Sequence, residues 1–172
     1  TQIIATVLSV DNENEYDVLA LNAASLGLQL AGVPLDSPIG AVRMSLINDN
    51  WVVQASNSEM EESVFDMVVA GNLNENNDVD IVMVEAGATE TAFDKIESGS
   101  TTPTEDIVAD GIDKSKEYIS ELIKAQAELV SQNEIPEVVW PLIEDYTPDL
   151  LSELEAAFKS DIETITSRTY RK

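Results

Sequence analysis

The 172-residue sequence contains no cysteine and no histidine. Without cysteine there is no disulfide, no thiolate nucleophile and no cysteine-type zinc site. Without histidine, the commonest metal ligand and the usual general base near neutral pH are missing as well. Any chemistry in this chain therefore has to use carboxylates, lysine, tyrosine, serine or threonine.

Basic residues are also scarce, with 9 Lys and Arg against 33 Asp and Glu, for a formal net charge of −24. Such a charge repels phosphate backbones at long range. The basic residues form no stripe and are not interleaved with aromatic residues, so the sequence gives no support for RNA contact through this chain. No apolar run reaches the roughly 20 residues that span a bilayer, and no signal peptide opens the chain, so we expect a cytoplasmic protein.

The composition, 44% hydrophobic and 24% charged, is typical of a folded protein. Residues 2–10 are almost wholly apolar and uncharged, which predicts a buried strand. A chain that opens inside a strand suggests a trimmed sequence. Asp17 is then expected to cap a buried helix that stops at Gly32. Alternation and turn residues predict two hairpins, formed by 41–47 with 51–53 and by 65–70 with 79–85.

Two amphipathic helices are predicted in the second half of the chain. Thr102 is expected to cap the first, with Pro103 at its first position and its end near Ser131. Residues 133–146 contain two prolines and are interpreted as a linker. Thr147 and Pro148 then repeat the cap-then-proline pattern at the start of the second helix.

Several segments together resemble the first ribonuclease PH-like core of the bacterial polynucleotide phosphorylase family (polyribonucleotide nucleotidyltransferase), in the family's order and at about its spacing. Two further segments, 103–112 and 124–129, resemble the version found in high-GC Gram-positive bacteria, and the last forty or so residues are similar in placement to the family's helical linker domain. The core segments are 1–9 (TQIIATVLS), 22–25 (NAAS), 32–34 (GVP), 40–43 (GAVR), 68–71 (VVAG) and 83–88 (MVEAGA).

The resemblance implies an α+β fold, with a ribonuclease PH-like mixed sheet and packed helices followed by a small all-α segment. It places 1–42 at the end of the N-terminal half of such a core, 43–131 in its C-terminal half, and 132–172 at the start of the helical linker domain. It also implies a homotrimeric enzyme that degrades mRNA from the 3′ end, using inorganic phosphate and Mg²⁺ and releasing nucleoside diphosphates. In the family the competent site lies in the second core, so this chain is expected to be structural, an inactive fragment that self-associates through exposed strand edges.

Candidate site positions follow from the same resemblance. Competent cores bind phosphate at the start of the buried helix, where this chain has Glu15, Tyr16 and Asp17, and two carboxylates would repel an anion. Competent cores also hold the metal on two Asp six residues apart, and those positions fall here on Ser58 and Val64. We therefore predict no catalytic, cofactor-binding or metal-binding residue in this chain.

Two alternatives remain open from the residues themselves. The chain could be an acidic, non-catalytic scaffold or binding module that shares the fold. It could instead bind a divalent cation, at a displaced site around Asp66 with Glu59, Glu61 and Glu62 nearby, or at the acidic loop 74–78. Against the loop, Val79 stands where a calcium loop needs glycine. Trp51 and Trp140 are interpreted as core or interface residues rather than base-stacking platforms.

Overall fold

The structure is a computed structural model that describes residues 2–139, 141, 143 and 145–168. The chain divides into two units, Thr1–Val138 and Val139–Lys172. Each unit is described by itself. The linker predicted at 133–146 spans the division, and its described residues carry no helix or strand. Trp140, for which a core or interface role was predicted, lies outside the described residues.

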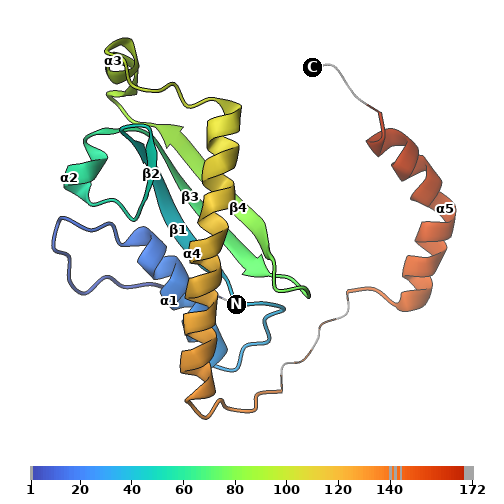
Figure 1. The fold of residues 1–172 in the computed structure, drawn as a ribbon. Helices are drawn as coiled ribbons and strands as arrows, with labels where there is room; N and C mark the ends of the chain where they lie inside the picture. The colour runs from blue at the N-terminus through green and yellow to red at the C-terminus, as the bar shows by residue number, and fades with distance from the viewer. Residues whose placement is uncertain (1, 140, 142, 144, 169–172) are drawn as a thin grey trace. The chain divides into compact units, whose positions relative to one another are not determined.

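A four-stranded sheet forms the centre of the first unit (Figure 1), in the order β2-β1-β3-β4. All three neighbouring pairs are antiparallel. Both predicted hairpins are confirmed, and Asn48 and Asp49 have the positive φ that a tight two-residue turn requires. The strands are β1 (Gly40–Ile47), β2 (Asn50–Val53), β3 (Ser63–Leu73) and β4 (Val79–Ala88).

Four helices belong to this unit, and α4 runs along the sheet in Figure 1. Side chains that alternate along β1 divide between the two faces of the sheet. Val42 and Met44 pack with Ile119 of α4, whereas Ala41 packs with Val18 of α1 on the opposite face. The core is therefore richest between the sheet and α4. The helices are α1 (Asp17–Leu30), α2 (Asn57–Met60), α3 (Ala92–Glu97) and α4 (Glu105–Ser131).

A set of polar side chains joins both long helices to the main chain at the start of β1. The Asn22 amide of α1 donates to the carbonyl of Ala41 at 2.8 Å, and its oxygen accepts from the Ala41 N–H at 3.1 Å. Ser25 Oγ accepts from the Ile39 N–H at 2.9 Å, and Gln126 of α4 donates to the Ile39 carbonyl at 2.9 Å. We call this set the β1 joint; it satisfies buried backbone groups that have no strand partner.

The second unit contains α5 (Pro148–Thr166). Thr147 caps it by accepting from the Leu150 N–H at 3.3 Å, and Pro148 occupies the first helical position, as predicted. Every described residue of this helix is exposed. Its stability within this unit therefore comes from local interactions.

The α+β fold class is confirmed, with three corrections. Residues 2–10 form no strand and are exposed, because no other described segment pairs with them. Without a strand there, the sheet is antiparallel among the described residues rather than mixed. The helix caps also shift: Tyr16 precedes α1, so that Asp17 is its first residue, and Thr104 caps α4 through the Ile107 N–H, in place of Thr102.

Candidate functional site

The face of the sheet opposite α4 carries a cavity of about 480 Å³ between α1, β3 and β4. Its polar lining comes from distant parts of the sequence, and the β ladder explains why they meet. Arg43 of β1 pairs with Val68, and Ser45 pairs with Asp66, so that charged side chains of two neighbouring strands share this face. The polar lining residues are Asp17, Arg43, Asp66, Glu85, Thr89 and Glu90.

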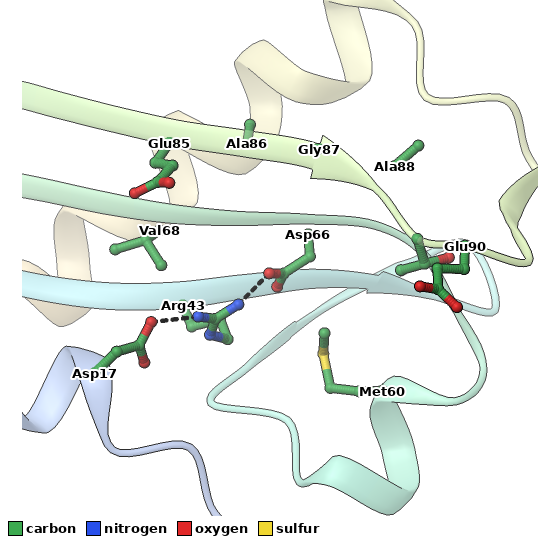
Figure 2. Close-up of a pocket in the computed structure, with 11 residues that line it drawn as sticks. Asp17, Arg43, Met60, Asp66, Val68, Glu85, Ala86, Gly87, Ala88 and Glu90 are labelled. Carbon is green, nitrogen blue, oxygen red and sulfur yellow. Dashed lines mark hydrogen bonds and ion pairs between the residues drawn. The ribbon is translucent and has the colours of Figure 1, made fainter.

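Arg43 forms ion pairs with two carboxylates at once, Asp17 at the start of α1 and Asp66 in β3. Figure 2 shows its guanidinium between these two side chains. The Arg43 side chain is 15% exposed, so water screens the pairs only in part. Burial by itself would lower the pKa of the guanidinium, but the charges of Asp66 and Asp17 outweigh burial and raise this pKa above its ordinary value. Arg43 is therefore a permanent cation held by two anions.

Asp66 has a second neighbour of importance, the buried Ser45. Ser45 Oγ lies 3.0 Å from Asp66 Oδ1 and 2.9 Å from Met60 Sδ. Both oxygens of the Asp66 carboxylate thus have a protein partner, one from Arg43 and one from Ser45. A ligand that needed this carboxylate would first have to displace them.

The start of α1 would ordinarily attract an anion, because free backbone N–H groups point out of a helix N-terminus. Here Asp17 supplies the negative charge itself. Its Oδ1 accepts from the Val18 N–H at 2.7 Å while its Oδ2 bonds to Arg43. Four carboxylates and one guanidinium line the cavity, which leaves a formal excess of three negative charges. The arrangement disfavours phosphate.

The two positions that correspond to the metal-binding acids of competent cores, Ser58 and Val64, do not line the cavity. Ser58 belongs to α2, and Val64 is buried with Leu46 and Ala92. Met60 and Asp66, which are also six residues apart, are the pair that lines the cavity. Sequence reasoning missed Arg43 and Glu85 as lining residues, although Arg43 is the one charge in its apolar strand and was a usable signal.

Residues in both regions considered as divalent-cation sites, the acids near Asp66 and the loop 74–78, make local structural contacts. Glu59 closes a capping box at α2, accepting from the Ser56 N–H at 2.8 Å. In the loop 74–78, Asn74 Oδ1 accepts from two backbone N–H groups, at 2.9 and 3.0 Å. Among the described residues, no group of three or more carboxylates is placed to hold a metal ion. Asp17 and Asp66 already share a cation in Arg43.

Residues 37–98, which contain all four strands, match the family model described as "3′ exoribonuclease family, domain 2". Polyribonucleotide nucleotidyltransferases of Nocardioides sp. and Streptomyces avermitilis are 45% and 46% identical to this chain over 161 residues. Those matches cover 94% of this chain. The chain is related to the polyribonucleotide nucleotidyltransferases. It spans 22% of the length of these curated relatives.

The fold also has a counterpart among solved structures. The crystal structure of rice (Oryza sativa) Rrp46 superposes with a TM-score of 0.56 at 13% identity, covering 71% of this chain and 51% of that one. At this identity the likeness concerns the fold alone, which is ribonuclease PH-like. The resemblance to polyribonucleotide nucleotidyltransferases is confirmed by the sequence matches. No helix in the described part of the chain is both long and apolar enough to cross a membrane.

Proposed function

We propose that this chain supplies a structural, non-catalytic part of a phosphorolytic 3′-to-5′ exoribonuclease. The carrying observation is the cavity on the α1 face, where Arg43 is bound by Asp17 and Asp66. A site for phosphorolysis needs a free positive charge, or free backbone donors, for the attacking phosphate. In this cavity the guanidinium and the start of α1 are both neutralised by carboxylates.

The whole enzyme, in this proposal, acts on RNA and inorganic phosphate, releases nucleoside diphosphates, and is a homotrimer that uses Mg²⁺. Four of the nine basic residues have partners within the chain, which supports a role outside RNA binding. Arg43 is engaged as described, Lys95 donates to the Ser63 carbonyl at 3.2 Å, and Lys114 and Lys116 pair with acids of α4 at 2.7 Å. Metal and phosphate are accordingly assigned to other parts of the enzyme.

We also propose the division into 1–42, 43–131 and 132–172, with the first two belonging to one ribonuclease PH-like core and the third to a helical linker domain. The family match over 37–98 supports a second half that starts close to β1. The separate unit around α5 supports a distinct helical region.

Phosphorolysis of poly(A) by the purified chain tests the proposal directly. With Mg²⁺ and phosphate supplied, we expect no nucleoside diphosphate above the level of a buffer control. Release that disappears in Asp66→Asn but persists in Glu128→Gln, which alters an exposed acid of α4, would place a working site in this cavity and overturn the proposal. Circular dichroism of both variants shows whether they are folded.

Two binding measurements test the remaining assignments. A mobility shift with single-stranded RNA at about 0.15 M salt, where the Debye length is about 8 Å, should be absent, because the excess of acids repels the backbone. Calorimetric titration with Mg²⁺ or Ca²⁺ should give no saturable heat. A single micromolar site would favour the alternative of a divalent-cation binder, and Asp66→Asn and Asp78→Asn would then identify which acidic region forms it.

A further inference from the structure

One polar contact on the α1 face of the sheet joins β1, β3 and α2. Ser45 in β1 is 0% exposed, and its Oγ lies 2.9 Å from Met60 Sδ and 3.0 Å from Asp66 Oδ1. A serine hydroxyl has one proton, and a carboxylate accepts it more strongly than a thioether does. Ser45 therefore donates to Asp66, while the Met60 sulfur lies against the same hydroxyl.

The Met60 side chain joins α2 to the sheet. The other three residues of α2 make bonds of a different kind, because its capping box is local and none of its residues is buried. Further bonds lead to the turn ahead of α1, where the Asn57 N–H donates to the Glu13 carbonyl at 2.8 Å. Among the described side-chain hydrogen bonds of α2, that of Met60 is the one that reaches the sheet. A chemical change at the Met60 sulfur thus acts on how α2 is held.

The four methionines of the chain differ in their surroundings. Met44 and Met67 are 1% and 0% exposed and belong to the core under α4, whereas Met83 is 36% exposed on β4. Met60 is half-buried and lines the cavity of about 480 Å³, and Figure 2 shows its side chain reaching from α2 toward Asp66. Met60 therefore combines access from the cavity with a contact to a buried hydroxyl.

The composition of the chain makes methionine the first target of a mild oxidant. The chain contains no cysteine, so no thiolate reacts with a peroxide before a thioether does. Oxidation of methionine gives the sulfoxide, a polar side chain that reductases convert back to the thioether. The cavity gives a small oxidant access to the Met60 sulfur.

We propose that Met60 is a site of reversible oxidation by hydrogen peroxide, and that its oxidation releases α2 from the sheet. One peroxide oxygen is transferred to Sδ as the O–O bond breaks. The sulfur gives up two electrons, and the second peroxide oxygen leaves as water with both hydrogens. This redox-sensitive contact does not depend on whether the chain is catalytic.

The sulfoxide cannot keep the present contact with Ser45. Because Ser45 Oγ and Met60 Sδ are 2.9 Å apart, an oxygen added between them pushes the sulfur away from the hydroxyl. An oxygen added on the cavity side is drawn toward water, since a polar group without a partner is costly to bury. Both products move the Met60 sulfur away from Ser45 and leave α2 with its bonds to the turn ahead of α1.

Peptide mapping by mass spectrometry measures how fast each methionine reacts in the folded chain. With hydrogen peroxide in excess, we expect Met60 to oxidise within about threefold of the exposed Met83 and at least about tenfold faster than the core methionines. In denaturant all four should react at similar rates, which controls for effects of the flanking sequence. Met60 that reacts as slowly as Met44 and Met67 would overturn the proposal.

Hydrogen exchange followed by NMR tests the release of α2. The background is Met83→Leu, which removes the exposed methionine of β4. After oxidation, the amides of residues 57–60 should exchange at least about fivefold faster, because local opening of α2 costs less without the Met60 contact. A methionine sulfoxide reductase should restore the slower exchange. Complete formation of the Met60 sulfoxide with unchanged exchange at 57–60 would refute the release.

Met60→Leu in the same background is the matched control, because leucine keeps the apolar volume without a sulfur. Circular dichroism should show it folded, and peroxide should leave its exchange at 57–60 unchanged. A peroxide response that persists in this variant would assign the effect to another residue and overturn the proposal.

Discussion

The helices α4 and α5 are both amphipathic, yet their apolar faces have opposite surroundings. Ile119 of α4 is 0% exposed and packs against the sheet, whereas Ile162 of α5 is 58% exposed. Both helices begin with a threonine cap. The spacing of apolar residues thus predicts a helix and which of its faces is apolar. The surface that covers this face has to come from elsewhere in the molecule or from outside it.

The largest expected effect comes from removing a buried anchor of α4. Ile119→Ala should lower the free energy of unfolding of the first unit by about 2–5 kcal/mol, because it leaves a cavity against Val42 and Met67. Ile162→Ala, the matched change on α5, should alter it by less than about 0.5 kcal/mol. Hydrogen exchange of the β3 amides reports this free energy. Equal effects of the two changes would overturn the contrast between the two helices.

A smaller effect is expected at Gly111, where α4 lies close to the sheet. A Cβ on Gly111 would lie 2.4 Å from Trp51 Cε2 and 2.6 Å from Met67 Cε. Gly111→Ala should therefore destabilise the unit by about 1–3 kcal/mol, less the roughly 1 kcal/mol that alanine gains over glycine in a helix.

Gly27→Ala in α1 is the control for that change, since a Cβ there meets nothing within 4 Å. It should stabilise the unit by about 0.5–1 kcal/mol. Thermal unfolding of the two variants should thus shift in opposite directions. The same sign for both would show that helix propensity dominates and that Trp51 moves aside freely.

Substituting the capping threonines of α4 and α5 shows how much each helix depends on local bonds and how much on packing against the rest of its unit. Loss of a threonine cap costs a helix about 0.5–2 kcal/mol. In Thr147→Ala this loss should visibly lower the helical population of α5, because little else holds it. In Thr104→Ala, α4 should remain helical, since the sheet holds its middle. Backbone chemical shifts of each helix measure this, and melting of α4 in Thr104→Ala would contradict the comparison.

The smallest effect concerns the turn ahead of α1, in which Asp11 accepts bonds from its neighbours in sequence. The Glu13 and Asn14 backbone N–H groups bond to Asp11 at 2.9 Å and lower the pKa of this carboxyl from 3.8 to about 2. The turn's contribution to stability is therefore complete above about pH 4 and is lost as the pH falls toward 2. NMR titration should show this midpoint. Asn14→Ala keeps these N–H groups but removes the bond from Asn14 Nδ2 to Asp11 Oδ2 at 2.6 Å, so the midpoint should rise part of the way toward 3.8. An unchanged midpoint would show that the backbone bonds act alone.

Much of the fold was predictable because it rests on local signals. The hairpin turn at Asn48 and Asp49, the cap at Thr147 and the spacing of apolar residues in α4 depend on neighbours in sequence. Residues 2–10 show the limit of such signals. Their composition favours a strand, but the prediction is wrong, because a strand forms only with a partner and composition does not supply one.

The candidate site was predictable only in part for a similar reason. Asp17 was singled out from its place before an apolar helix, and Asp66 from its place in a strand. Arg43 connects them, and this contact depends on the register of β1 with β3, in which Ser45 lies opposite Asp66. A shift of one residue would turn Asp66 to the other face. Register is set by the whole sheet, so no local pattern revealed the Arg43 pairs.

The β1 joint has a consequence for how this sequence can change. Asn22, Ser25 and Gln126 bond to the main chain of Ile39 and Ala41, and every residue except proline offers the same main-chain groups. Substitution at 39 or 41 can therefore alter local packing without removing the bonds that position the two helices. The three polar residues have no such freedom. Among related sequences, we therefore expect residues 39 and 41 to vary more than Asn22, Ser25 and Gln126.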